Sequence, residues 1–132
     1  MSVNKSVLVI SESQRQFSLA ANLLRAEGYK VSFAGNINKS LKIVDAEPPQ
    51  LIISELAMPD IDGLQICKQF RSDYRMCQTP ILLVGDLSEN SSIVKDSRRC
   101  GASDYVQKPF TFKVLTAKVM ELLEARPMAM SA

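Results

Sequence analysis

The stretch Leu51-Ile-Ile-Ser-Glu-Leu-Ala-Met-Pro-Asp-Ile-Asp-Gly63 decides the fold of this chain. It begins with an apolar run that is typical of a strand buried on both faces of a parallel sheet. The run ends in one acid, Glu55, and Met58-Pro59 then forces a turn. Asp62-Gly63 closes the loop before a helical pattern begins. An acid at the C-terminal tip of a buried strand lies where parallel α/β sheets bind ligands and carry out chemistry.

Strands and helices alternate on both sides of this segment. Short apolar runs predict strands at residues 7–10, 29–34, 51–54, 80–84 and 104–107. Apolar residues at helical spacing predict helices around residues 17–24, 37–44, 64–70, 88–99 and 115–123. Gly28 ends the first helix and Pro48 the second. Five strands alternating with five helices predict an α/β fold, with a parallel sheet covered by helices on both faces.

The length of the chain is that of one domain. No linker or repeat interrupts the pattern within its 132 residues. The periodicity is lost from Arg126 onward, so we expect a domain over residues 1–125 and a tail, or the start of a linker, over 126–132. The chain is 46% apolar and 23% charged, as in an ordinary globular protein.

Composition also excludes several classes of function. A net charge of +2 with scattered basic residues argues against nucleic-acid binding, and the basic stretch Lys95–Arg99 is interpreted as a solvated helix face. The absence of histidine excludes His-ligand zinc sites and Ser-His nucleophile pairs. No run approaches the ~18 apolar residues that span a bilayer. Three cysteines (Cys67, Cys77 and Cys100) indicate free thiols, and with no signal peptide they predict a cytoplasmic protein.

Several polar residues follow the ends of the predicted strands. The C-terminal ends of parallel strands lie at one edge of the sheet, so residues far apart in sequence meet there. These tip residues are Ser11-Glu12, Glu55, Gly85-Asp86 and Lys108-Pro109.

This layout resembles the receiver domain of bacterial response regulators over residues 7–123. The most specific matches are Met58-Pro59-x-x-Asp62-Gly63 and Tyr105-Val-Gln-Lys108-Pro109-Phe110. The resemblance implies a flavodoxin-like (βα)5 fold with strand order 2-1-3-4-5, and a role in two-component phosphorelay signalling. It also implies a cis peptide at Lys108-Pro109 and a docking surface on helix 4, strand 5 and helix 5. The partners on that surface would be a sensor kinase or an output protein.

Compared position by position with the family, this sequence departs from it at three sites. Glu55 stands at the position of the phosphoacceptor aspartate, and Ser11-Glu12 replaces a pair of acids that holds Mg²⁺. Gly85 replaces a residue whose hydroxyl binds the phosphoryl group. Lys108 is retained, and Tyr105 occupies the aromatic switch position. Glu12 and Glu55 remain as the ligands of a weakened Mg²⁺ site, and no cofactor is required.

These departures predict an atypical receiver, or pseudo-receiver. One extra methylene moves the carboxylate by more than ~1 Å, and displacements of that size can cost ~10²-fold in rate. We therefore predict that the chain is not an enzyme and acts by phosphorylation-independent protein–protein interaction. Glu55 is expected to pair with Lys108. Its single negative charge would imitate a phosphoryl group, at about −1.5 to −2, only imperfectly.

Two other functions stay open at this point. One is a receiver that accepts a phosphoryl group on Glu55 or Asp86. The other is a flavodoxin-like binder of a flavin or nucleotide, although the loop Ser11–Gln14 lacks the glycine of a phosphate site.

Bland roles are also expected for several residues near the site. Asp60, Asp62 and Asp86 are expected to form turns or helix caps, and Cys67 to lie in the core. Tyr105 is expected to pack as a half-buried aromatic with a partner for its hydroxyl. Whether the chain forms a homodimer is open.

Overall fold

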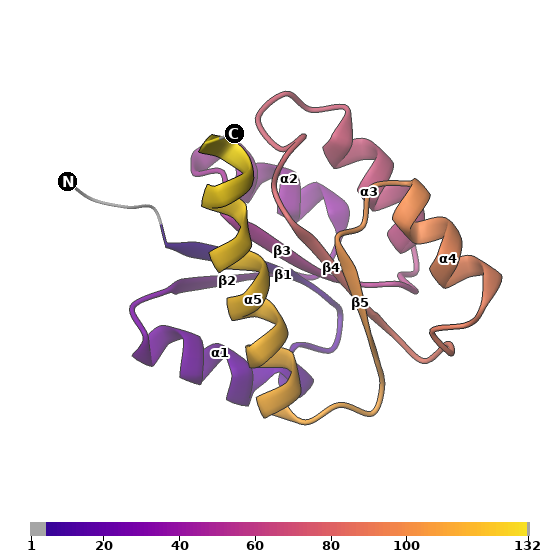
Figure 1. Cartoon of the computed structure of the whole chain (residues 1–132), viewed down its shortest axis with the longest axis horizontal. Coiled ribbons are helices and arrows are strands. Elements are labelled where there is room, and N and C mark those ends of the chain that lie inside the picture. The colour runs from indigo at the N-terminus through magenta and orange to yellow at the C-terminus, as the bar shows by residue number, and fades with distance from the viewer. Residues whose placement is uncertain (1–4, 132) are drawn as a thin grey trace.

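A parallel sheet with helices on both faces forms the structure, a computed structural model that describes the backbone of residues 5–131 and the side chains of residues 5–124 (Figure 1). Within these residues the sheet order is β2-β1-β3-β4-β5, and every neighbouring pair is parallel. The predicted flavodoxin-like fold is therefore confirmed. The strands are β1 (Ser6–Ile10), β2 (Lys30–Ala34), β3 (Leu51–Glu55), β4 (Ile81–Gly85) and β5 (Asp104–Gln107). The helices are α1 (Ser18–Ala26), α2 (Ile37–Ala46), α3 (Gly63–Arg71), α4 (Ser92–Arg99) and α5 (Phe112–Ser131), with a short 3-10 turn at Gln14–Phe17.

Alternate residues of the strands fill two apolar layers, one on each face of the sheet. Leu8 and Ile10 of β1 belong to the layer beneath α2, α3 and α4. Val7 and Val9 belong to the layer beneath α1 and α5, which lie side by side. Because successive side chains of a strand point to opposite faces, a run such as Val7–Ile10 serves both layers. That is why the central strands β1, β3 and β4 are apolar over most of their length and show no regular alternation with polar residues.

Helix α4 begins later than the sequence predicted. We expected a helix from Ser88, but α4 starts at Ser92. The side-chain oxygen of Ser91 accepts a hydrogen bond from the Val94 amide at 3.1 Å and caps the helix. Residues 88–91 instead form a turn, in which the Ser91 amide donates to the Ser88 carbonyl at 2.9 Å. Two serines three residues apart can both serve as caps, so the sequence pattern did not show which of them begins the helix.

Other element boundaries differ from the expected ones by two residues at most, apart from the last helix. β2 begins at Lys30 and not Tyr29, and β4 runs from Ile81 to Gly85 in place of 80–84. α5 continues to Ser131, although we expected regular structure to stop near residue 125. The side chains from 125 onward lie outside the described residues, so the division into domain and tail stays a prediction.

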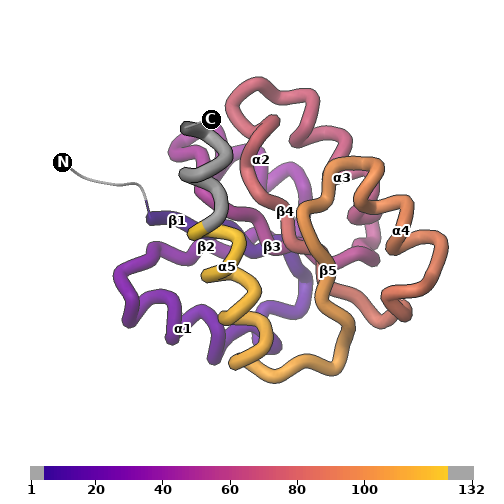
Figure 2. The backbone as a smooth tube through the Cα atoms, viewed as in Figure 1, coloured from indigo at the N-terminus to yellow at the C-terminus, as the bar shows by residue number. Residues whose placement is uncertain are grey.

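The course of the chain places the strand ends together. In the tube of Figure 2, β1, β3 and β4 run in the same direction, and the loops that follow them reach the same side of the molecule. The register agrees, since Ile10 is level with Ser54, and Glu55 with Val84. In the part of the chain that is described, no helix is long and apolar enough to cross a membrane.

Candidate functional site

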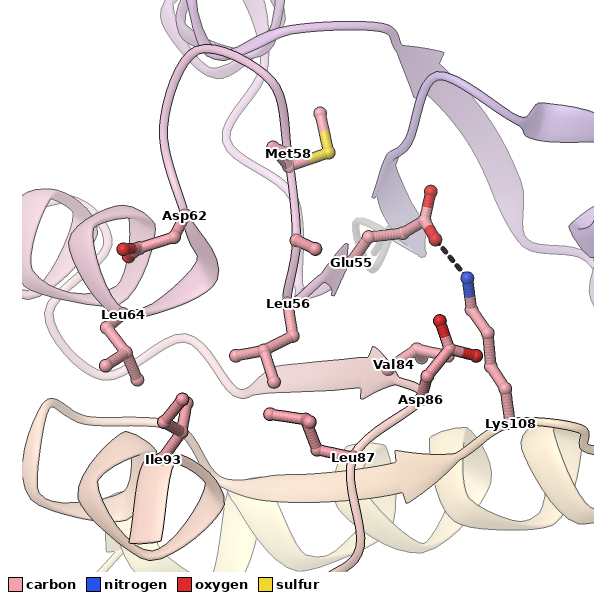
Figure 3. Close-up of a pocket in the computed structure, with 12 residues that line it drawn as sticks. Glu55, Leu56, Met58, Asp62, Leu64, Val84, Asp86, Leu87, Ile93 and Lys108 are labelled. Atoms are coloured by element: carbon pink, nitrogen blue, oxygen red, sulfur yellow. Dashed lines mark hydrogen bonds and ion pairs between the residues drawn. The ribbon is translucent and has the colours of Figure 1, made fainter. Parts of the chain in front are cut away.

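Glu55 is the last residue of β3 and lies at the centre of the strand-tip site. Its side chain is only 12% exposed. The Ser11 hydroxyl donates a hydrogen bond to Oε2. The Lys108 ammonium forms an ion pair with Oε1, which Figure 3 shows as a dashed line. The predicted pairing of Glu55 with Lys108 is therefore confirmed. Both carboxylate oxygens are engaged, one by each partner.

Ser11 follows β1 directly and is held in place by the backbone. Its amide donates to the Ala34 carbonyl at 2.9 Å, and its hydroxyl oxygen accepts from the Ser13 amide at 2.9 Å. The residue is fully buried. We had considered Ser11 only as the loss of an acid, and its hydrogen bond to Glu55 was missed. No sequence signal points to that bond, because it depends on the reach of the longer glutamate side chain.

Lys108 follows β5 and is fixed by the neighbouring strand. Its amide donates to the Gly85 carbonyl at 2.7 Å, and the Lys108–Pro109 peptide is cis, as the resemblance implied. The next residue, Phe110, stacks on Phe17 with ring centroids 5.8 Å apart. The loops after β1 and β5 are thus joined beside the site.

Glu12 does not take part in this constellation. It is exposed, and none of the hydrogen bonds of Glu55 reaches it. The described residues contain no group of three or more His, Cys, Asp or Glu side chains placed to hold a metal ion. Mg²⁺ requires several hard oxygen ligands in octahedral geometry. Because a hydroxyl and an ammonium already occupy the oxygens of Glu55, this donor set does not fit Mg²⁺.

Gly85 and Tyr105 lie in close contact at the end of β4. A Cβ atom at Gly85 would lie 3.0 Å from Leu56 Cβ and 3.1 Å from the Tyr105 hydroxyl oxygen. The Tyr105 ring is buried, more than the half-burial we expected, and its hydroxyl donates to the Leu87 carbonyl at 2.6 Å. Burial raises the pKa of Tyr105 above its usual value. Because Gly85 has no side chain, the Tyr105 ring has room to be buried beside it.

An apolar cavity opens beside the ion pair. Its volume is about 550 Å³. Figure 3 shows the side chains of Leu56, Leu64, Leu87 and Ile93 pointing toward one another around its apolar side. Glu55, Asp86 and Lys108 gather at the other side. Sequence reasoning placed the polar residues at one edge correctly, but it gave no indication of the cavity.

The three acids expected to form turns or caps differ in their roles. Asp62 caps α3, since its Oδ1 accepts from the Gln65 amide at 2.9 Å, which confirms the prediction for this residue. Asp60 and Asp86 are exposed, and neither caps a helix. Asp86 lines the cavity.

Arg71 was not singled out from the sequence, yet it organises the opposite end of β4 and β5. Its guanidinium donates to the carbonyls of Met76, Thr79 and Gly101 at 2.7–3.0 Å. The three acceptors are backbone atoms, which leave no pattern in a sequence. Nearby Cys67 is buried, as predicted, and burial raises its pKa to about 12.

Comparison with known proteins supports the family that these features indicate. Residues 7–120 match the response regulator receiver domain family. The alkaline phosphatase synthesis transcriptional regulatory protein PhoP of Bacillus subtilis is 32% identical over 127 residues, which are 96% of this chain and 52% of that protein. The chain spans about half the length of the curated transcriptional regulators it matches.

Solved structures agree with the fold. The receiver domain of a signal transduction histidine kinase from Syntrophus aciditrophicus is 28% identical, with a TM-score of 0.79 over 92% of this chain and 91% of that one. The chemotaxis protein CheY4 of Vibrio cholerae has a TM-score of 0.81 at 24% identity, over 91% of this chain and 99% of that one, and supports the fold alone. A family match over most of the chain favours a receiver over a flavin or nucleotide binder of the same topology.

Proposed function

This chain belongs to the response regulator receiver domain family of two-component signalling, and we propose that it works there without being phosphorylated at Glu55. It acts by binding protein partners in a conformation that does not depend on phosphorylation. The engagement of both Glu55 oxygens, by Ser11 and by Lys108, is the observation that carries this proposal.

Phosphoryl transfer needs a free carboxylate oxygen in line with the leaving group and a metal ion that neutralises charge. At this site each Glu55 oxygen already has a donor, Ser11 for one and Lys108 for the other, and these contacts lower the nucleophilicity of the carboxylate. The longer side chain also displaces the attacking oxygen, and the donor set for Mg²⁺ is poor. Receiver domains typically bind Mg²⁺ at the phosphorylation site. In this chain we expect the affinity for Mg²⁺ to be weak, and no catalytic turnover.

Two contacts favour a conformation that does not depend on phosphorylation. Lys108 is drawn to Glu55, and Tyr105 is buried with its hydroxyl bound to the Leu87 carbonyl. Because residue 85 is a glycine, it has no side-chain hydroxyl that could form a hydrogen bond with a phosphoryl group. A chemical change at Glu55 would therefore not change the position of the Tyr105 side chain.

Receiver domains interact with sensor histidine kinases and with output domains. For this chain we place the docking surface on α4, β5 and α5. Asp104 of β5 pairs with Arg98 of α4 at 3.4 Å and with Lys118 of α5 at 3.0 Å, so the three elements form one surface. Val114, 53% exposed, provides apolar area within it. A protein partner, or a second copy of the chain, binds there.

Incubation with acetyl phosphate and Mg²⁺, followed by intact-mass spectrometry, tests the proposal. We expect no mass gain for the wild-type chain. A variant that restores the family's acids and hydroxyl, Ser11→Asp with Glu55→Asp and Gly85→Thr, is the matched positive control. It is expected to gain the mass of one phosphoryl group under the same conditions.

A stoichiometric phosphoryl adduct on the wild-type chain would contradict the proposal. Asp86 is the second candidate acceptor, since it is exposed and lines the cavity beside Lys108. If an adduct forms, its loss in Asp86→Asn would assign it to Asp86, and its loss in Glu55→Gln to Glu55.

A further inference from the structure

The apolar side of the strand-tip cavity includes large hydrophobic side chains that are exposed to solvent, unlike those of the core. Leu87 is 38% exposed and Ile93 is 45% exposed, and both line the cavity with Leu56 and Leu64. These residues come from the loops after β3 and β4 and from the first turns of α3 and α4. A volume of about 550 Å³ lies within the range of small-molecule sites, roughly 300–1,000 Å³.

The charges around the cavity are unbalanced. Lys108 and Glu55 pair with each other, so that pair contributes no net charge. The carboxylates of Asp62 and Asp86 remain. Asp62 accepts a hydrogen bond from the Gln65 amide, whereas Asp86 has no hydrogen bond or ion pair with any described residue. The lining therefore carries a net charge of −2 (three carboxylates and one ammonium), in a chain whose net charge is +2.

From this combination we propose that the cavity binds a small organic cation, an amine with a compact apolar body. The apolar body lies among Leu56, Leu64, Leu87 and Ile93, and the ammonium group pairs with Asp86. An anionic ligand is disfavoured because the only cation in the lining, Lys108, is already paired with Glu55. A neutral apolar ligand would leave the exposed Asp86 carboxylate hydrated and would gain nothing from its charge.

Titration of ¹⁵N-labelled protein with 2-phenylethylamine, followed by amide chemical shifts, tests this proposal. The neutral 2-phenylethanol, which has the same number of non-hydrogen atoms, and the anionic 3-phenylpropanoate, which has two more, serve as comparison probes. We expect shifts confined to the cavity lining. The amine should bind roughly fivefold more tightly than the alcohol at low ionic strength, since an exposed ion pair is worth at most about that much. This preference should diminish as salt is added.

Two variants separate the charge from the apolar contacts. Asp86→Asn should reduce the affinity for the amine to that for the alcohol, whereas Asp60→Asn, an exposed acid outside the lining, should change neither. Leu87→Ala should weaken both ligands equally. Equal affinities of the three probes, shifts on another surface, or no shift up to the solubility limit of the amine would overturn the proposal.

The same spectra test the competing occupant. If the amides of the cavity shift with protein concentration before any probe is added, a second copy of the chain covers the cavity, and the proposal is wrong. No phosphoryl donor is present in these experiments, so their outcome is independent of whether Glu55 can be phosphorylated.

Discussion

Glu55 shows what one methylene group changes in a strand-tip carboxylate. The longer side chain brings one oxygen to the Ser11 hydroxyl and the other to the Lys108 ammonium. A partly buried carboxylate without such donors would carry a desolvation cost. The pair of partners removes that cost, and the same bonds leave the carboxylate without a free oxygen.

Removing the cation should therefore destabilise the fold. In Lys108→Met, Glu55 keeps only the Ser11 hydroxyl as donor in a site that is 12% exposed. We expect the free energy of unfolding, measured by urea denaturation at pH 7, to fall by about 1–3 kcal/mol. Part of this loss should be recovered when Glu55→Gln is added, because the carboxylate left unpaired is then removed.

A double-mutant cycle measures this coupling. With both single variants and the double variant, we expect an interaction free energy of about 1 kcal/mol or more between the two positions. Strictly additive losses would mean that Glu55 and Lys108 do not stabilise each other.

Sequence reasoning reached part of this site and not the rest. The positions of Glu55 and Lys108 at adjacent strand tips follow from the topology of parallel strands, so their pairing could be predicted. The bond from Ser11 could not, because a serine beside an acid in a loop has many alternative partners. Glu12, next to it in sequence, was assigned to a metal site but is exposed and lies apart from Glu55's partners.

Three elements meet at Arg71, the last residue of α3. Its guanidinium binds the Met76 and Thr79 carbonyls before β4, and the Gly101 carbonyl after α4. A single side chain thereby satisfies three backbone acceptors in connections that have no regular structure. Burial lowers the pKa of Arg71 from its usual value, but an arginine stays protonated in any case.

Gly101 should be sensitive to substitution because of this contact. It has a φ of +109°, and a Cβ there would lie 2.5 Å from Arg71 Cγ. Gly28 is a matched control, with a φ of +94° and nothing within 4 Å of its Cβ position. We expect Gly28→Ala to cost about 1 kcal/mol of stability through backbone strain, and Gly101→Ala to cost about 2 kcal/mol more through crowding.

Thermal and urea unfolding of the two variants measure this difference. If both substitutions cost the same, the contact with Arg71 imposes no constraint on Gly101. At this scale the sequence placed Gly28 after the first helix correctly. It could not distinguish the crowded position from the open one, because the neighbour is 30 residues away in sequence.

At the scale of the whole molecule, two apolar layers pack against the sheet, and ion pairs link α4, β5 and α5 at the surface. Burial alone would raise the pKa of Asp104. Hydrogen bonds from the Tyr105 amide and Lys118, together with the charges of Lys118 and Arg98, outweigh the effect of burial, so the pKa lies below its usual value of 3.8.

The alternation of strands and helices along the chain made both apolar layers predictable. The ion pairs across α4, β5 and α5 could not be predicted, because their residues are far apart in the sequence and their side-chain rotamers depend on packing.

Asp104 should make stability depend on pH in acid. Its folded pKa is lowered, so its contribution is fully present above its usual pKa of 3.8 and is lost as the pH falls through the lower folded value. Asp104→Asn should lower the free energy of unfolding by about 1 kcal/mol at pH 7. The difference from the wild-type chain should shrink below pH 3.8.

Urea titrations at a series of pH values check this prediction, with Asp60→Asn as the control for loss of a surface charge. A difference between Asp104→Asn and the wild-type chain that is constant across the series would show that the paired carboxylate has no part in acid stability.

The hydrogen bonds of Arg71 have a consequence for how α4 can move. They attach the segment after the C-terminal end of α4 to α3, whereas the N-terminal end of α4 borders the open cavity. We expect α4 to pivot about its attached end when the cavity widens or narrows. Ser92 and Ile93 would then travel furthest and Arg99 least, so that a small ligand at the strand tips would tilt α4 relative to α5.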